Sequence, residues 1–311
     1  PVSDEPLSLE LPKRLAGQRF DRALAELIPG TSGARLQKLV RLGRVKLNGQ
    51  RVLRSNFKVK GGEQVLVHLE APPAPAPPPE LEWLEIAERY AVVNKPDGML
   101  AHPADRAHGP SVSESATAKL GRLPSTDDAH RPGIVHRLDR ETSGVMILAR
   151  DAAAMDDLRD QFRARTVKKT YLALAVGEPP AESFDVDRSL AQDPHQLDLQ
   201  RVDPKGKEAL SSFTVLESFR SPELGNVHWI ECRPKTGRRH QLRVHLKHAG
   251  LYLIADKLYR PPGQSQPHKQ LKHQALHAAE LELAPPGVAG RQTFTAPVRS
   301  DLAALIERLR G

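Results

Sequence analysis

One carboxylate, Asp139, stands between two arginines, Arg137 and Arg140, in a segment that runs from residue 136 to 149. A turn-forming run follows it, and residues 145–149 are then apolar without interruption. A short, continuous apolar run of this kind predicts a buried strand. A polar loop in front of such a strand can hold one acid rigidly at the floor of a cleft, for use as a nucleophile or a general base. Taken alone, however, a loop aspartate is more often a turn or cap residue.

The elements around this loop follow no regular alternation between residues 81 and 311. Apolar or alternating stretches predict strands at 90–94, 145–149, 168–176, 212–216 and 227–231. Helices are predicted at 152–165, 239–248 and 301–309, the last with Ser300 as its cap. Residues 261–271 are predicted to form an exposed loop that contacts a partner. This irregular order predicts an α+β domain rather than a doubly wound sheet.

A proline-rich run separates this region from the start of the chain. Six of the eight residues from Pro72 to Pro79 are proline, which favours an extended conformation without a backbone contribution to a packed core. We therefore expect a spacer at 71–80 between domains at 1–70 and 81–311.

The N-terminal segment is predicted to form a small basic domain. Residues 18–28 have helical apolar spacing, Ser32 can cap a second helix, and Asn48-Gly49 offers a tight hairpin turn. A last strand is predicted at 64–69. The second helix and its end carry four cations, Arg35, Lys38, Arg41 and Arg44. They predict an RNA contact, and a solvated basic face is the alternative.

Composition limits the function classes. The chain has 311 residues and a net charge of +8, which fits a polyanionic partner and ordinary surface charge about equally well. Its one cysteine, Cys232, excludes an internal disulfide and fits a reducing cytoplasm. No apolar span approaches the length of a membrane helix, and no leader is expected. The 13 histidines lack recognisable metal-site spacing, so no metal is expected.

Six separate phrases, in order, resemble those of the RluA-type RNA pseudouridine synthases across most of residues 80–310. They are Asn94-Lys95-Pro96 with Gly98 and His102-Pro103, the stretch 133–149, Lys169-Thr170-Tyr171, Gly206-Lys207-Glu208-Ala209, the stretch 234–246, and Ala275-Leu276-His277-Ala278. Residues 17–70 similarly resemble the alpha-L RNA-binding fold, also called the ribosomal-protein-S-four-like domain. Together they imply a mixed, mainly antiparallel catalytic sheet behind an RNA-binding domain.

The resemblance assigns roles to individual side chains. Asp139 would be the essential catalytic residue, and Arg243 would pair with it through two parallel hydrogen bonds. Tyr171 would stack on the target base and take part in removing the C5 proton. Arg137 would fill the space left by the flipped uridine, and Leu276 would form an apolar wall. His136 and Arg140 are expected to bind substrate. No cofactor is needed, because the reaction is an isomerisation.

Some alternatives remain open at this stage. Asp139 could attack C1′ or C6, or remove the C2′ proton, and only the resemblance favours proton removal through a glycal. The N-terminal domain points to large-subunit (23S) ribosomal RNA or an assembling ribosomal particle as substrate. The RluD type fits best, the RluC type next and tRNA-directed enzymes less well. A monomer is expected. A non-catalytic, RNA-binding ribosome-assembly factor is the competing class.

One segment departs from the family pattern. The usual Gly-His-Pro-Ile-x-Gly-Asp phrase is replaced by residues 250–256, with Ala255 in place of the second glycine. This loop is predicted to lie outside the catalytic positions, so activity should survive the change.

Overall fold

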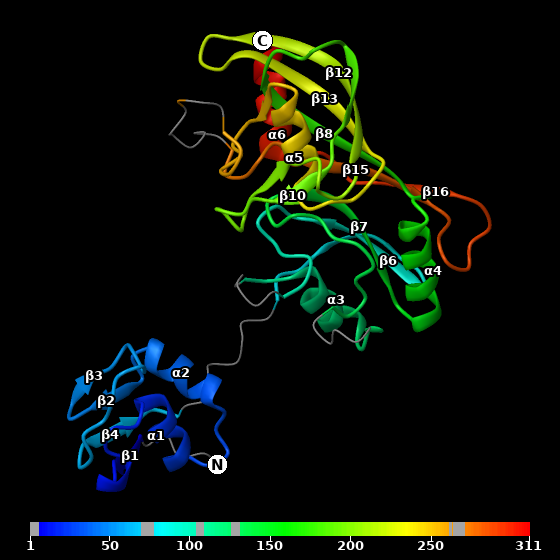
Figure 1. Ribbon diagram of the computed structural model, residues 1–311. Coiled ribbons are helices and arrows are strands. Elements are labelled where there is room, and N and C mark those ends of the chain that lie inside the picture. The colour runs from blue at the N-terminus through cyan, green and yellow to red at the C-terminus, as the bar shows by residue number, and fades with distance from the viewer. Residues whose placement is uncertain (1–5, 70–77, 104–108, 126–130, 261–262, 264–270) are drawn as a thin grey trace. The chain divides into compact units, whose positions relative to one another are not determined.

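The computed structural model describes residues 6–69, 78–103, 109–125, 131–260, 263 and 271–311. Two compact units make up the chain, Pro1–Pro77 and Pro78–Gly311 (Figure 1). Most of the predicted 71–80 spacer lies outside the described residues. The exact limits of the two domains therefore remain predictions.

The N-terminal unit packs two helices against a four-stranded antiparallel sheet. The helices are α1 (Phe20–Leu27) and α2 (Gly33–Arg41), preceded by the short 3-10 turn η1 (Lys13–Leu15). The strands lie in the order β1 (Leu7–Glu10), β4 (Gln64–Val67), β2 (Val45–Leu47) and β3 (Gln50–Arg51). The predicted helices, hairpin and last strand are confirmed, and β1 is an addition.

Local chemistry explains these elements. The Ser32 hydroxyl accepts a hydrogen bond from the Arg35 amide at 3.3 Å, so the predicted cap of α2 is confirmed. Asn48 and Gly49 both have positive φ, +49° and +82°, which a tight hairpin turn requires. The apolar faces of both helices meet in one core, where Phe20 stacks on Phe57 with ring centroids 4.9 Å apart.

The second unit is built on a ten-stranded sheet. Its main path is β5 (Glu82–Ile86), β6 (Tyr90–Lys95), β7 (Ser143–Ala149), β15 (Leu276–Leu283), β8 (Lys168–Gly177), β13 (Gly225–Pro234), β12 (Leu210–Ser221) and β9 (Ser183–Asp187). Beside this path, β14 (Leu251–Leu253) pairs with β8 and β16 (Gln292–Thr295) with β15. The strands β10 (Leu190–Gln192) and β11 (Gln200–Val202) form a separate pair. Only β7 and β15 pair in parallel among these strands, which confirms the mixed, mainly antiparallel α+β fold.

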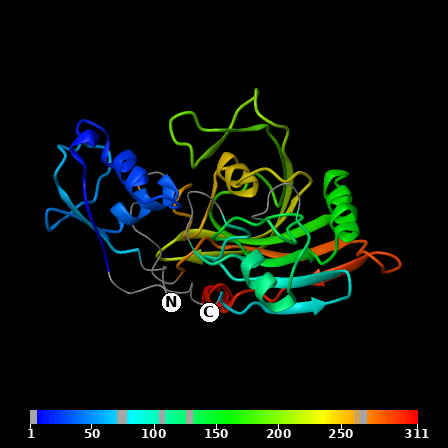
Figure 2. The same cartoon turned by 90° about the horizontal axis from the view of Figure 1, so that it is seen from below.

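Helices cover both faces of this sheet. They are α3 (Val112–Leu120), α4 (Ala152–Arg163), α5 (Gln241–His248) and α6 (Ser300–Arg310). Ala173 and Ala175 of β8 share a core cluster with α5, whereas Leu174 between them packs in the cluster of α6. Successive side chains of a strand point to opposite faces, so α5 and α6 lie on opposite sides, as Figure 2 shows.

Two sequence expectations need correction here. Ser300 is the first residue of α6 rather than its cap, and Arg299 occupies the cap position without a capping side-chain hydrogen bond. Most of the loop predicted at 261–271 lies outside the described residues, but Leu271 at its end is buried in the core cluster of α6.

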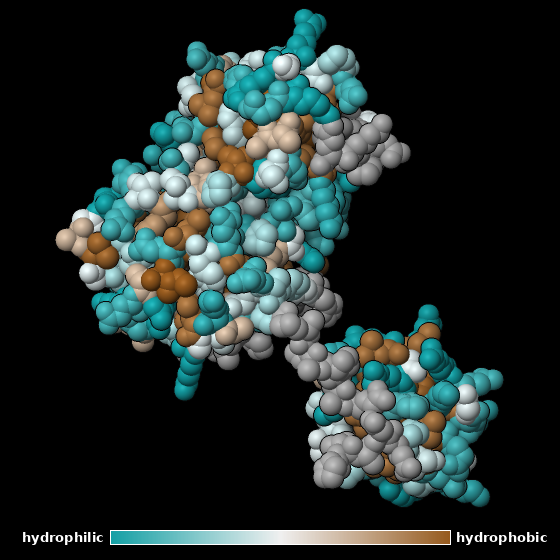
Figure 3. All heavy atoms as spheres, turned by 180° about the vertical axis from the view of Figure 1, so that it is seen from behind, coloured by the Kyte–Doolittle hydropathy of each residue, from teal (hydrophilic) through white to brown (hydrophobic). Residues whose placement is uncertain are grey.

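The face of the protein drawn in Figure 3 is largely hydrophilic, with separate apolar areas. No helix in the described part of the chain is long and apolar enough to cross a membrane.

Candidate active site

Asp139 lies in the turn that enters β7. All seven residues of β7 are buried, and the Thr142 amide donates to the Asp139 carbonyl at 3.1 Å. Gly144 has φ +118°, and a Cβ there would lie only 2.1 Å from the Ala278 carbonyl oxygen of β15. Glycine therefore allows β7 to approach β15 closely, and the turn carrying Asp139 is fixed to the centre of the sheet.

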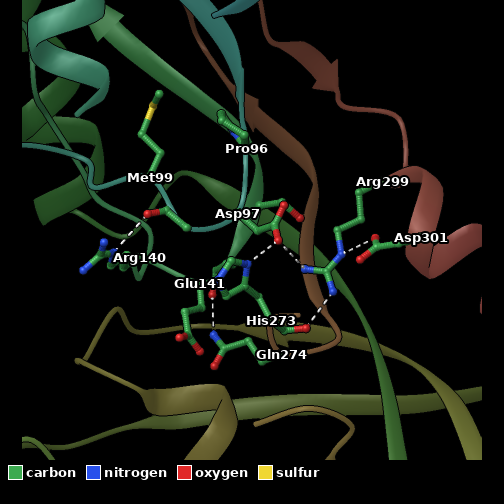
Figure 4. Close-up of polar contacts among 12 residues, drawn as sticks. Pro96, Asp97, Met99, Arg140, Glu141, His273, Gln274, Arg299 and Asp301 are labelled. Atoms are coloured by element: carbon green, nitrogen blue, oxygen red, sulfur yellow. Dashed lines mark hydrogen bonds and ion pairs between the residues drawn. The ribbon is translucent and has the colours of Figure 1, made fainter. Parts of the chain in front are cut away.

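A polar network supports the same turn from behind, and Figure 4 shows its side chains. The side-chain amide of Gln274 donates to the Thr142 hydroxyl at 2.8 Å. The residue before Gln274 in the chain, His273, belongs to the same network. The imidazole of His273 contacts the Asp97 carboxylate at 2.5 Å, and Arg299 donates to the His273 carbonyl at 2.7 Å. Segments far apart in sequence thus meet behind the turn.

Arg140 belongs to this support rather than to the cavity. Its Nε donates to the Gly98 carbonyl at 3.0 Å, and its own carbonyl accepts from the Gly98 amide at 2.8 Å (Figure 4). It is not among the residues that line the cavity in front of Asp139. The substrate contact predicted for Arg140 therefore has no support in this geometry.

A cavity of about 560 Å³ opens in front of Asp139. It brings together six of the predicted site residues, Asp139, Tyr171, Arg243, Leu276, Arg137 and His136. Their elements are the turn before β7, strands β8 and β15, and helix α5. A volume of this size is within the usual range for small-molecule sites, so it can hold one nucleoside-sized group.

The cavity is strongly cationic. Among the residues that the structure describes, Asp139 is the only carboxylate that lines it. The lining lysines and arginines are Arg137, Arg163, Arg165, Lys169, Lys235, Arg238, Arg239 and Arg243. Burial lowers the pKa of His136 to about 3 and that of His240 to about 4, so both imidazoles are neutral near pH 7. Lysine and arginine therefore supply the positive charge, which suits a polyanion.

Arg243 approaches Asp139 but does not make the predicted double hydrogen bond to it. Its Nη1 lies 3.7 Å from Asp139 Oδ2, an ion pair beyond hydrogen-bond distance. Its Nε and Nη2 instead donate to the two oxygens of Asp256, at 2.7 Å each. The predicted bidentate pair was therefore wrong. Sequence reasoning missed Asp256, although it ends the altered 250–256 segment, because that loop was placed outside the site.

Tyr171 and Leu276 lie in the apolar part of the cavity. Leu276 is buried on β15, and Tyr171 is half-buried on the adjacent strand β8. Burial, together with the Asp139 carboxylate, raises the pKa of the Tyr171 phenol well above its usual value. The phenol is therefore neutral at physiological pH and offers a flat face and a proton.

His136 has a supporting contact that its sequence position did not reveal. Its ring stacks on Phe162 of α4 with centroids 4.5 Å apart. Its Nε2 accepts a hydrogen bond from the Ile147 amide at 3.1 Å. The imidazole thus forms a wall of the cavity and ties the site to β7. Arg137, next to it, is exposed at the cavity.

The cations predicted in the N-terminal unit are on or near α2. Arg35, Lys38 and Arg41 are exposed, and Arg44 after the helix is half-buried. The apolar residues of the same helix, Leu36, Leu39 and Val40, are buried. The helix therefore presents a basic face to solvent.

The histidines near the site have partners within the protein. His245 contacts the Ser211 hydroxyl and the Arg188 carbonyl, each at 3.0 Å. Within the described ranges, no group of three His, Cys, Asp or Glu side chains is arranged to hold a metal ion. A metal-free reaction remains a prediction.

Comparison with known proteins agrees with this geometry. A family model described as RNA pseudouridylate synthase matches residues 89–248, and one described as S4 domain matches residues 18–65. An uncharacterized RNA pseudouridine synthase of Chloroflexus aurantiacus is 37% identical over 306 residues, covering 96% of this chain and 92% of that protein.

Two further similarities extend the comparison. The ribosomal large subunit pseudouridine synthase D of Xylella fastidiosa is 36% identical over 314 residues, covering 96% of this chain and 91% of that protein. The structure of human RNA pseudouridylate synthase domain containing 4 has a TM-score of 0.55 and 26% identity, and covers 74% of this chain and 93% of that one. This chain therefore belongs to the RNA pseudouridylate synthase family, and it carries an S4 RNA-binding domain ahead of its catalytic unit.

Proposed function

We propose that this enzyme isomerises uridines of large-subunit ribosomal RNA to pseudouridine, with Asp139 as its catalytic residue. The observation that carries the proposal is the position of Asp139. Within the described part of the chain it is the one carboxylate that lines a cationic cavity, and it lies 3.7 Å from Arg243. The substrate class follows the ribosomal large subunit synthases to which the chain is similar along nearly its whole length.

The chemistry needs one ionised acid next to the ribose. The N1–C1′ bond of uridine breaks, the base turns, a C5–C1′ bond forms and the C5 proton is lost while N1 gains one. Removal of the C2′ proton by Asp139 would yield a glycal intermediate. Attack of Asp139 on C1′ or C6 is the other route. Atoms and electrons balance without an external reductant or oxidant, so no cofactor is required.

The remaining cavity residues would hold a flipped uridine. Extrusion of the base costs a few kcal/mol, which contacts in the cavity must offset. Tyr171 would stack on the base beside Leu276. Arg137, exposed beside Asp139, would occupy the space in the RNA helix from which the uridine departs.

The two basic surfaces would bind the RNA backbone. Arg163, Arg165 and Arg238 line the cavity and can contact the phosphates that flank the target. Arg35, Lys38 and Arg41 are exposed on α2 and would contact a second part of the RNA. Phosphate contacts of this kind position RNA without reading its sequence.

The first experiment measures tritium release from large-subunit rRNA that carries 5-tritiated uridine, with wild type beside Asp139→Asn. We expect release by wild type alone and RNA binding by both proteins. The same assay on tRNA and on precursor ribosomal particles identifies the substrate.

Three results can be told apart. Release by both proteins would remove Asp139 from the mechanism. Release only from tRNA would overturn the substrate class. Binding without release from any RNA would leave a ribosome-assembly factor that has kept the fold.

A further inference from the structure

The guanidinium group of Arg243 is held by two side chains that lie outside the catalytic turn. Asp256 accepts hydrogen bonds from Nε and Nη2, and the side chains of Arg243 and Asp256 are only 4% and 1% exposed. The guanidinium carbon lies over the Tyr259 ring, 4.9 Å from its centroid. The third nitrogen, Nη1, faces Asp139. Arg243 is thus fixed from the side opposite to the catalytic residue.

The same carboxylate also shapes the turn that carries Tyr259. Oδ1 of Asp256 accepts from the amides of Leu258 at 2.8 Å and Tyr259 at 3.0 Å. Burial alone would raise the pKa of Asp256, but the Arg243 guanidinium and these two amides bring it below its usual value. Asp256 is therefore ionised and holds both the arginine and the turn.

Tyr259 is fixed at its other end as well. Its hydroxyl accepts from the Gln200 amide at 2.7 Å and lies 2.8 Å from Nδ1 of His240. The ring therefore cannot turn away from Arg243 without losing buried hydrogen bonds, which makes it a rigid platform for the cation.

This arrangement has a consequence for the reactivity of Asp139. A free arginine beside a carboxylate prefers two short parallel hydrogen bonds, which would engage both carboxylate oxygens. Here Asp256 accepts the two parallel hydrogen bonds from Arg243, and Arg243 Nη1 stays 3.7 Å from Asp139 Oδ2. The positive charge of Arg243 therefore stays beside Asp139, while Arg243 makes no hydrogen bond to that carboxylate oxygen.

We propose that Asp256 and Tyr259 are positioning residues, which hold Arg243 away from Asp139 so that Asp139 stays oriented yet free to react with the ribose. The inference rests on the proposed role of Asp139 as the catalytic residue. It assigns a function in the reaction to the altered 250–256 loop and to the turn after it.

Asp256→Asn is the sharpest test. The amide oxygen of asparagine can still accept from Leu258 and Tyr259, but its NH₂ group would face the Nε donor of Arg243. Arg243 would then be released toward Asp139. In single-turnover reactions with saturating enzyme, we expect the rate constant to fall about 100-fold while the Kd for RNA changes less than about twofold.

The matched control is Asp151→Asn, which makes the same chemical change at another arginine partner. Asp151 accepts from Arg89 Nε at 3.0 Å and Nη2 at 3.2 Å and does not line the cavity. The single-turnover rate constant of this control variant should equal that of wild type. Thermal unfolding of both variants measures how much stability each change removes.

A second pair of variants tests the positioning role of Tyr259, and so the inference, if Asp256→Asn fails to fold. Tyr259→Phe and Tyr259→Leu both lose the hydroxyl, but only Phe keeps the ring under Arg243. We expect the Leu variant to react about 5- to 10-fold more slowly than the Phe variant, with equal RNA affinity.

Two outcomes overturn the inference while wild type remains active. One is a folded Asp256→Asn protein with an unchanged rate constant. The other is a loss of activity in Asp256→Asn or Tyr259→Leu, relative to its control, that appears wholly as a weaker Kd for RNA. A loss of activity that disappears at a lower temperature, where the variant is fully folded, has the same meaning. An inactive wild type would instead overturn the proposed function, so the two failures are distinguishable.

Discussion

The ammonium group of Lys95 donates a hydrogen bond to the carbonyl oxygen of Arg140 across 3.1 Å, and so connects the end of β6 to the turn of Asp139. It also donates to the carbonyls of Pro96 at 2.9 Å and Met99 at 2.8 Å. The side chain is fully buried, and three carbonyls match the three N–H groups of an ammonium ion. Below about pH 7 a cation is therefore held inside the support of the catalytic turn.

The first prediction concerns the pH dependence of stability at Lys95. Burial lowers its pKa from 10.5 to about 7 in the folded protein. Between these values the unfolded chain binds the proton and the folded chain does not, so stability rises with pH. Relative to Lys95→Met, the free energy of unfolding of wild type should increase from pH 7 to 10 by up to about 1.4 kcal/mol per pH unit. Urea titrations at several pH values measure it.

The control for this prediction is Lys119→Met, which removes one positive charge from an exposed position on α3. Stability curves of wild type and Lys95→Met that run parallel across this range would contradict the assignment of a depressed pKa.

Lys169 should make RNA binding sensitive to pH. Burial, with the nearby Arg165 charge, lowers its pKa to about 8, and its Nζ donates to the Thr236 carbonyl at 3.4 Å. Above pH 8 the cavity therefore loses one cation. We expect wild-type affinity for RNA to fall between pH 7 and 9, and Lys169→Gln to bind equally at both pH values with a salt slope smaller by about 1.

Lys235→Gln is the matched variant for this measurement, because Lys235 is exposed and lines the same cavity. It keeps Lys169 and should keep the pH-dependent loss. Fluorescence anisotropy with labelled RNA measures the affinity at each pH. An equal loss of affinity with pH in Lys169→Gln and wild type would refute the assignment of this pH dependence to Lys169.

The altered 250–256 loop carries backbone strain that glycine should relieve. Ala255 has φ +61°, a conformation that costs an L-residue roughly 1 kcal/mol or more, offset in part by the greater flexibility of unfolded glycine. Ala255→Gly should therefore raise the free energy of unfolding by about 0.5 to 1 kcal/mol. Chemical denaturation measures it. Gly250→Ala, at φ +83° with its nearest atom 3.8 Å away, should be destabilised instead.

The basic face of α2 should contribute to RNA affinity through counterion release. Replacing Arg35, Lys38 and Arg41 together with glutamine leaves the buried face of the helix intact. Each lost phosphate contact should reduce the slope of log K against log salt by about 0.9 for duplex and 0.7 for single strands. Removal of residues 1–70 should have a larger effect of the same kind. An unchanged slope in the triple variant would exclude this face as an RNA contact.

Local patterns in the sequence were sufficient for most elements and for the family. The helices of the N-terminal unit, strand β7 and helix α4 depend on apolar spacing and on caps such as Ser32, which operate within a few residues. The motif order around Asp139, Tyr171 and Arg243 likewise appears in the linear chain. These residues do line one cavity.

Only the tertiary structure decided which side chains in the site contact one another. The sequence placed Arg243 with Asp139, but packing of α5 against the 250–256 loop turned its hydrogen-bonding edge to Asp256, 13 residues away. Arg140 became a support for Gly98, and the imidazole of His136 was engaged by Ile147. Periodicity reports which face of an element is buried, whereas the partner of a side chain depends on where distant segments meet in space, which no local pattern records.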